Sequence, residues 1–173
     1  MLGQMLRVAI AVETGPVALR YPRGSEPDGE VPPPVSVQPS RSGGQLLREG
    51  SDVLLIGVGI MSSACLEAAS LLESHGISAA VLDPVWLKPS PDDTIADLAS
   101  RCGSVITVED GSLEGGYGSH VRGSLANMGV RVLSLGIPDG FQPHADRDHL
   151  LEDLGLTPVS IAAAAEGIVE HDS

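Results

Sequence analysis

The chain has 173 residues, a length that suits one domain with a sizeable core plus a smaller appendage. Its formal net charge is -13 with only ten Lys and Arg residues, which argues against a nucleic-acid backbone or an anionic membrane as partner. Hydrophobic residues make up 42% of the chain but aromatic residues only 2%, which predicts an aliphatic core of the kind found in parallel sheets covered by helices.

The start of the chain predicts one helix and one strand without partner elements. Apolar residues recur at helical spacing over residues 2–12, and Thr14-Gly15-Pro16 ends this pattern before a short strand, Val17 to Tyr21. Residues 25–42 follow, rich in proline and without periodicity. Their composition is typical of an extended linker.

Residues 43–173 show a regular alternation of strands and helices. A hairpin is expected first, and its second strand, Val53 to Val58, is continuously apolar and therefore predicted to be buried on both faces. Ser90 is the expected N-cap of a helix that Gly103 closes, and Met128 is expected on the inner face of the next helix. The full set of expected strands is 45–47, 53–58, 78–82, 105–108 and 132–135, and the expected helices follow Ile60, Ser90, Gly116, Asp146 and Thr157.

This alternation predicts an α/β fold with three layers. A mostly parallel sheet with one antiparallel edge strand is flanked by helices and joined by right-handed crossovers. Ligands of such sheets meet the carboxyl ends of the strands, so a binding site is expected there.

Cys65 and Cys102 are too few for a disulfide framework, and both lie in apolar helical patterns. A reduced, cytoplasmic compartment is therefore expected. The sequence shows neither a cleavable leader pattern nor an apolar run long enough to span a bilayer, so no membrane association is expected.

Two arginines near the end of the first predicted strand form a candidate phosphate site. Arg20 and Arg23 lie in Arg-Tyr-Pro-Arg-Gly, where Pro22 favours an extended conformation and Gly24 lets the chain turn away. A guanidinium is a permanently charged planar fork that suits phosphate oxygens. The alternative is that both arginines are surface residues beside a turn.

Two glycine-rich turns follow predicted strands. Gly57-Val58-Gly59 resembles part of a dinucleotide-binding turn but lacks the third glycine, so a tight turn that lets the helix pack is the favoured interpretation. In residues 109–119, glycines precede a helix whose free amides suit an anion. Glu109, Asp110 and Glu114 would repel one, so we expect a structural turn at a subunit contact.

A cluster of histidine and aspartate lies in residues 143–149. His144, Asp146, Asp148 and His149 could ligate a metal. Asp146 is also a natural N-cap and Asp148 suits the dipole of the following helix, so capping accounts for the acids without a metal.

Several segments together resemble the C-terminal third of the 1-deoxy-D-xylulose-5-phosphate synthase family, within the thiamine-dependent transketolase-like superfamily. They are residues 20–24, 106–110 with 115–119, and 135–139 with 146–147 and 154–156. Val-Trp-Leu-Lys-Pro at 85–89 is similar to a further family segment. The resemblance covers nearly the whole chain in the correct order. Gly111 and Ala145 depart from the family pattern, which leaves room for different loop conformations.

The resemblance implies a homodimeric transferase that uses thiamine diphosphate and Mg²⁺. Such enzymes decarboxylate pyruvate and join the two-carbon unit to glyceraldehyde 3-phosphate, at the head of isoprenoid and thiamine biosynthesis. It implies that Arg23 contacts the phosphate of the aldehyde, with Arg20 as a weaker candidate. It also implies that residues 1–24 are the last helix and strand of a truncated pyrimidine-binding domain, and that residues 43–173 are the transketolase C-terminal-like domain.

The chain contains no Gly-Asp-Gly motif for the metal and diphosphate. We therefore expect no cofactor-binding, metal or catalytic residue in this chain, no cofactor bound to it, and no activity without the rest of the enzyme. Two alternatives stay open. The first is that the chain is the C-terminal domain of a transketolase or of a 2-oxo-acid dehydrogenase beta subunit. The second is that it is a free-standing interaction module.

Overall fold

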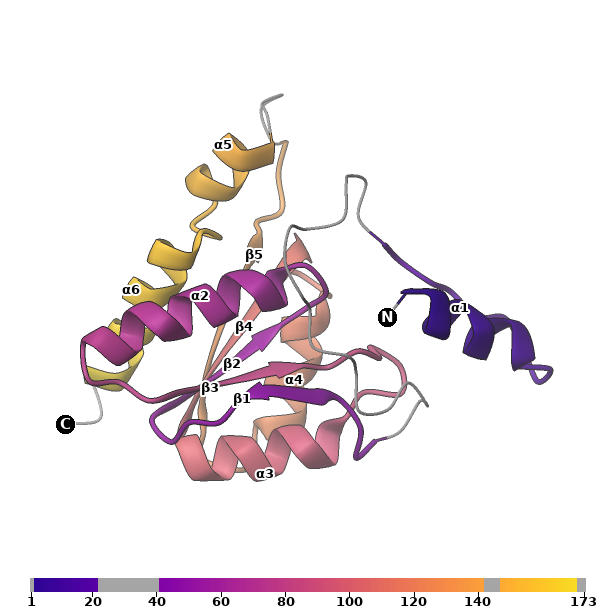
Figure 1. Cartoon of the computed structure of the whole chain (residues 1–173), viewed down its shortest axis with the longest axis horizontal. Helices are drawn as coiled ribbons and strands as arrows, with labels where there is room; N and C mark the ends of the chain where they lie inside the picture. The colour runs from indigo at the N-terminus through magenta and orange to yellow at the C-terminus, as the bar shows by residue number, and fades with distance from the viewer. Residues whose placement is uncertain (1, 22–40, 142–146, 171–173) are drawn as a thin grey trace.

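The computed structural model describes residues 2–21, 41–141 and 147–170. Five strands form one sheet in the order β1-β3-β2-β4-β5, flanked by helices on both faces (Figure 1). The strands are β1 (Gln45–Arg48), β2 (Val53–Gly57), β3 (Ala79–Asp83), β4 (Ser104–Ser112) and β5 (Arg131–Ile137). The helices are α1 (Leu2–Ala11), α2 (Met61–Ser74), α3 (Asp92–Cys102), α4 (Tyr117–Leu125), α5 (Arg147–Asp153) and α6 (Pro158–Glu170).

The sheet is parallel except at one edge. β3, β2, β4 and β5 run in one direction, and β1 pairs antiparallel with β3. All five residues of β2 are buried, because helices cover both faces of this central strand and its side chains alternate between them. The predicted three-layer fold with an antiparallel edge strand is confirmed.

Two apolar clusters fill the spaces between the layers. On one face α2 and α6 pack on the sheet around Leu55, Val81 and Ile106. On the other face α3 and α4 pack around Leu54 and Leu82. The clusters consist mainly of Val, Leu, Ile and Ala, as the low aromatic content predicts.

The predicted hairpin is wrong, because β1 pairs with β3 instead of β2. The connection between β1 and β2 crosses the start of β3, where the amides of Ser51 and Asp52 both donate to the carbonyl of Ser78, at 3.0 and 2.9 Å. A Cβ on Gly50 would lie 2.2 Å from the backbone of Ala79, so only glycine permits this crossing. The crossing leaves β2 and β1 on opposite sides of β3.

Three local predictions also need correction. Pro91, not Ser90, occupies the N-cap position of α3, since the Ser90 hydroxyl is instead hydrogen-bonded to the buried Tyr117 hydroxyl. Met128 lies beyond the end of α4 and is 41% exposed. Residues 17–21 form no strand, because a strand needs a neighbour and the structure gives this segment none among the described residues.

The N-terminal arm, residues 2–21, stands apart from the sheet (Figure 1). α1 has no buried residue, and its apolar Leu2, Leu6 and Ile10 are 47%, 50% and 76% exposed. The predicted helix at the start of the chain is confirmed, and its apolar stripe has no described partner. Within the described ranges, no helix is both long and apolar enough to span a bilayer.

Two glycines of α4 offer a matched test of how closely this helix packs on the sheet. A Cβ on Gly118 would lie 2.5 Å from Thr107 Oγ1 and 2.6 Å from Ser134 Oγ, whereas a Cβ on Gly123 meets nothing within 4 Å. Gly118→Ala should lower the free energy of unfolding by about 1–3 kcal/mol through overpacking. Gly123→Ala should raise it by about 0.5–1 kcal/mol through helix propensity. Urea unfolding of both variants checks this, and equal effects would contradict the close contact.

Candidate functional site at the carboxyl ends of the strands

The turn after β2 brings α2 against the sheet. The Ser62 hydroxyl donates to the carbonyl of Gly57 at 2.7 Å, and a Cβ on Gly57 would lie 2.6 Å from Ser62 Cα. Gly59 has a φ of 61°, the left-handed region that favours glycine. This is the geometry of the predicted tight turn between strand and helix.

Glu109 occupies the helix terminus that the glycine-rich turn creates. It lies near the end of β4, is 7% exposed, and its carboxylate accepts hydrogen bonds from the amides of Tyr117 at 3.0 Å and Gly118 at 2.8 Å. Free amides at a helix N-terminus need acceptors, and the helix dipole favours a negative charge there. An acid of the chain itself thus takes the amides that could have bound an external anion, and the turn has the structural role that the sequence predicts. Its predicted place at a subunit contact stays a prediction.

Glycines make the space for this carboxylate. A Cβ on Gly116 would lie 2.6 Å from Glu109 Oε1 and 2.0 Å from the carbonyl of Ser112, and a Cβ on Gly136 would lie 3.3 Å from Glu109 Cγ. The Ser119 hydroxyl closes the turn by donating to the carbonyl of Leu113 at 2.9 Å. The turn is therefore built around the side chain of Glu109.

The arm meets the domain beside this turn. Arg20 Nη2 donates to the backbone carbonyl of Asp110 at 2.9 Å, and a Cβ on Gly111 would lie 3.6 Å from Arg20 Nη1 and 3.3 Å from Glu109 Oε2. The phosphate role of Arg20 stays a prediction. Arg23, the stronger candidate, lies outside the described residues.

A second buried acid, Asp83, lies at the carboxyl end of β3. Asp83 is 4% exposed, and its Oδ1 accepts the amide of Val85 at 2.8 Å. Burial raises the pKa of Asp83 above its ordinary value, against hydrogen bonds from Val85 and Ser62 that lower it.

Cys65 is buried near Asp83, and both conditions affect the pKa of its thiol. Its side chain is fully buried, and burial together with the charge of Asp83 raises the pKa of the thiol to about 12. The thiol therefore stays protonated at neutral pH.

Asp92 at the start of α3 links three segments. Its carboxylate lies 3.0 Å from Arg41 Nη2 and 2.8 Å from His120 Nε2, and His120 stacks on Tyr117 with ring centroids 5.9 Å apart. Burial alone would raise the pKa of Asp92, but hydrogen bonds from Ser90 and His120 and the charges of His120 and Arg41 outweigh it and lower the pKa. The charge of Asp92 is thus satisfied within the domain.

The described residues do not fit a diphosphate and metal site. The amides at the start of α4 are taken by Glu109, and no group of three metal-ligating side chains occurs in the described ranges. His144 and Asp146 of the predicted metal cluster, with Asp146 as predicted N-cap, lie outside the described residues.

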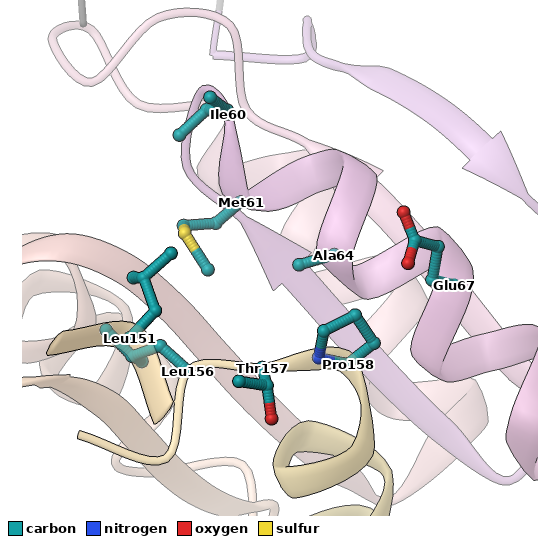
Figure 2. A pocket seen from close by; sticks show the side chains of 8 residues that line it. All are labelled: Ile60, Met61, Ala64, Glu67, Leu151, Leu156, Thr157 and Pro158. Carbon is teal, nitrogen blue, oxygen red and sulfur yellow. The ribbon is translucent and has the colours of Figure 1, made fainter. Parts of the chain in front are cut away.

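A hollow of about 350 Å³ lies between the start of α2 and the turn before α6 (Figure 2). Its lining is apolar apart from Thr157 and the carboxylate of Glu67, which lies at one side of the hollow. It offers no cationic group for a phosphate.

Sequence reasoning identified the Glu109 turn but not its partner. The sequence does not show that the Glu109 side chain folds back onto the amides of Tyr117 and Gly118, because that contact depends on how β4 and α4 are placed in three dimensions. Asp83 carried a usable signal, since an acid directly follows a fully apolar strand. The contact between Asp92 and His120 joins two helices and left no signal in the spacing.

Comparison with known proteins gives a consistent picture. The profile described as "Transketolase, C-terminal domain" matches residues 42–161. The chain is 42% identical over 171 residues to 1-deoxy-D-xylulose-5-phosphate synthase of Symbiobacterium thermophilum and 39% identical over 163 residues to that of Chlorobaculum tepidum. These alignments cover 97% and 93% of the chain but only 26% of each relative. The predicted resemblance is confirmed.

Solved structures support the same fold. A structure described as "Split gene transketolase, inactive beta4 tetramer" is 35% identical with a TM-score of 0.73, and the match covers 81% of this chain and 47% of that one. A Pichia stipitis transketolase has a TM-score of 0.55 at 18% identity, over 75% of this chain and 18% of that one. At that identity the second match bears on the fold alone.

Removal of the Glu109 charge should destabilise the domain. Glu109→Gln leaves one of the two α4 amides facing an NH₂ group, so the free energy of unfolding should fall by about 1–3 kcal/mol. Glu114→Gln on the same exposed turn is the control and should change it by less than about 0.5 kcal/mol. Chemical unfolding at pH 7 measures both, and equal stabilities would contradict the capping role.

Asp83→Asn should raise stability at neutral pH. The pKa of Asp83 is raised on folding, so wild-type stability should fall as pH rises from about 3.8 through the folded-state pKa. Asparagine keeps the acceptor for the Val85 amide without a buried charge, whereas Asp83→Ala removes that acceptor and should be less stable. Urea unfolding of the three proteins between pH 4 and 8 tests this. A less stable Asp83→Asn variant at pH 7 would contradict it.

Proposed function

The chain belongs to the transketolase C-terminal domain family, and we propose that it is the C-terminal part of a 1-deoxy-D-xylulose-5-phosphate synthase. The observation that carries the proposal is identity of 39–42% over more than 90% of the chain to enzymes of that name. The chain spans about a quarter of the length of these relatives.

In this proposal the longer enzyme decarboxylates pyruvate and condenses the two-carbon unit with glyceraldehyde 3-phosphate to give 1-deoxy-D-xylulose 5-phosphate. Thiamine diphosphate and Mg²⁺ supply the carbanion chemistry, held by parts of the enzyme outside this chain. The contribution of this chain is a rigid domain beside the active site and the arginine segment that meets the phosphate of the aldehyde.

The domain assignment follows from the same match. The family profile begins at residue 42, which supports a transketolase C-terminal-like domain from residue 43 onward. We assign residues 1–24 to the end of a preceding pyrimidine-binding domain, with residues 25–42 as the linker. The unpartnered apolar stripe of α1 supports this, since a helix with no buried residue needs a neighbour. The longer enzyme is proposed to be a homodimer.

The isolated chain is proposed to be inactive. The 35% identical split-gene transketolase, whose description calls its tetramer inactive, supports this. The assay mixes the chain with pyruvate, glyceraldehyde 3-phosphate, thiamine diphosphate and Mg²⁺, with and without the remainder of the enzyme made separately. Turnover by the chain alone would contradict the proposal.

A transketolase is the second candidate, favoured by that same structural relative. The two candidates differ in the donor substrate. A synthase releases carbon dioxide from pyruvate, whereas a transketolase takes its two-carbon unit from a ketose phosphate. Measuring both donors with the longer enzyme distinguishes the candidates.

Arg23→Ala in the longer enzyme should raise the KM for glyceraldehyde 3-phosphate about 10–100-fold, because a charged hydrogen bond to phosphate is lost. The KM for pyruvate should stay unchanged. Arg101→Ala, an exposed arginine at the opposite end of the sheet, is the control. An unchanged KM for the aldehyde in Arg23→Ala would argue against the assignment.

A further inference from the structure

The chain carries two apolar surfaces that remain open to solvent within the ranges that the structure describes. One is the stripe of α1 formed by Leu2, Leu6 and Ile10, all of which are exposed. Successive members are four residues apart, so they form one row along the helix. The other is the hollow between the start of α2 and the turn before α6. Both surfaces hold apolar area in water that an association would remove.

The hollow is a groove that follows α2. Ile60, Ala64 and Glu67 line it on the α2 side, and Pro158 lies on the facing wall (Figure 2). How closely two helices approach depends on the side chains at their contact, and Ala64 is small. A second helix can therefore lie close to α2 at this point and place apolar side chains in the groove. This is the way in which amphipathic helices bind to apolar grooves.

The stripe and the groove have complementary charges at matching positions. Glu67 is exposed, lies one helical turn along α2 from Ala64, and has no hydrogen bond or ion pair with the described residues. Arg7 is exposed and unpaired in the same sense, and it lies one turn along α1 from Ile10. With Ile10 over Ala64, Arg7 therefore meets Glu67, since a turn spans about 5.4 Å on both helices. The described arm, residues 2–21, holds two arginines and one glutamate, whereas the chain has a net charge of -13.

α1 does not fill the groove of its own chain. In Figure 1, α1 stands at one side of the molecule, and α5 and α6 stand at the other with the sheet between them. The helix that the chain offers to the groove therefore comes from a second copy. One ten-residue helix makes a small contact against the roughly 1,000 Å² that a specific interface buries. Reciprocal exchange doubles the contact and closes it as a two-fold dimer.

We propose that two copies of this chain associate by exchanging α1. Leu6 and Ile10 of each copy lie in the α2 groove of the other copy, and Arg7 pairs with Glu67 across each contact. In the longer enzyme of the proposed function the preceding domain covers α1 instead. The exchange is therefore a property of this chain on its own, and it does not rest on the proposed function.

Charge reversal tests the pairing of Arg7 with Glu67. Sedimentation equilibrium of the chain from micromolar to millimolar concentrations should show a monomer–dimer equilibrium. Arg7→Glu and Glu67→Arg should each raise the Kd of the dimer at least about tenfold, because two pairs per dimer become repulsive, and the double variant should regain the parental Kd. Asp97→Arg, an exposed acid on α3 at the opposite face of the sheet, makes the same charge change and should leave the Kd unchanged. A chain that stays monomeric throughout, or a double variant that is not rescued, would overturn the proposal.

An alanine pair on α1 tests the apolar contact. Leu6→Ala should raise the Kd at least about tenfold, because two leucine side chains per dimer leave an apolar groove. Gln4→Ala, on the far side of α1 from the stripe, is the control and should leave the Kd unchanged. Leu6 and Glu67 are both exposed, so neither change disturbs the folded monomer. A dimer that Leu6→Ala breaks and Glu67→Arg does not would show that two α1 helices pack on each other, and it would overturn the groove as the docking site.

Discussion

The two hydrogen bonds from the α4 amides to the Glu109 carboxylate are the constraint on which the carboxyl edge of the sheet depends. A helix that starts inside a protein leaves amides without partners, and each one left unsatisfied costs about 1–3 kcal/mol. One carboxylate satisfies two of them and also complements the helix dipole. The end of β4 and the start of α4 therefore behave as one unit.

This constraint explains the glycines around the turn. Gly116 and Gly136 line the space that the Glu109 side chain needs, and Gly118 lets α4 approach Thr107 of the sheet. The residues that look like a loop for an external phosphate are thus required by an internal anion. The arm reaches the same turn, where Arg20 donates to the carbonyl of Asp110.

The elements were largely predictable from the sequence, and their partners were not. The apolar run of β2 and the glycine at 103 gave a buried strand and a helix end because both signals are local. The pairing of β1 with β3 goes together with hydrogen bonds from the amides of Ser51 and Asp52 to the carbonyl of Ser78. These contacts join residues far apart in the chain, so no local sequence pattern predicts them. Ser90 likewise has the composition of an N-cap, but the buried hydroxyl of Tyr117 competes for it. The candidate site residues follow the same rule. The local motif around Arg20 marks it as a candidate, but its contact with Asp110 joins residues ninety positions apart and could not be predicted from the sequence.

The burial of Cys65 makes its reaction with thiol reagents a measure of local unfolding. Burial raises the pKa of the Cys65 thiol to about 12, so the thiol is protonated at pH 7, and the side chain has no exposed surface. A thiol reagent can therefore modify this residue only when α2 separates from the sheet. The rate of Cys65 modification under native conditions then reports how often the core opens, and no residue has to be introduced for the measurement.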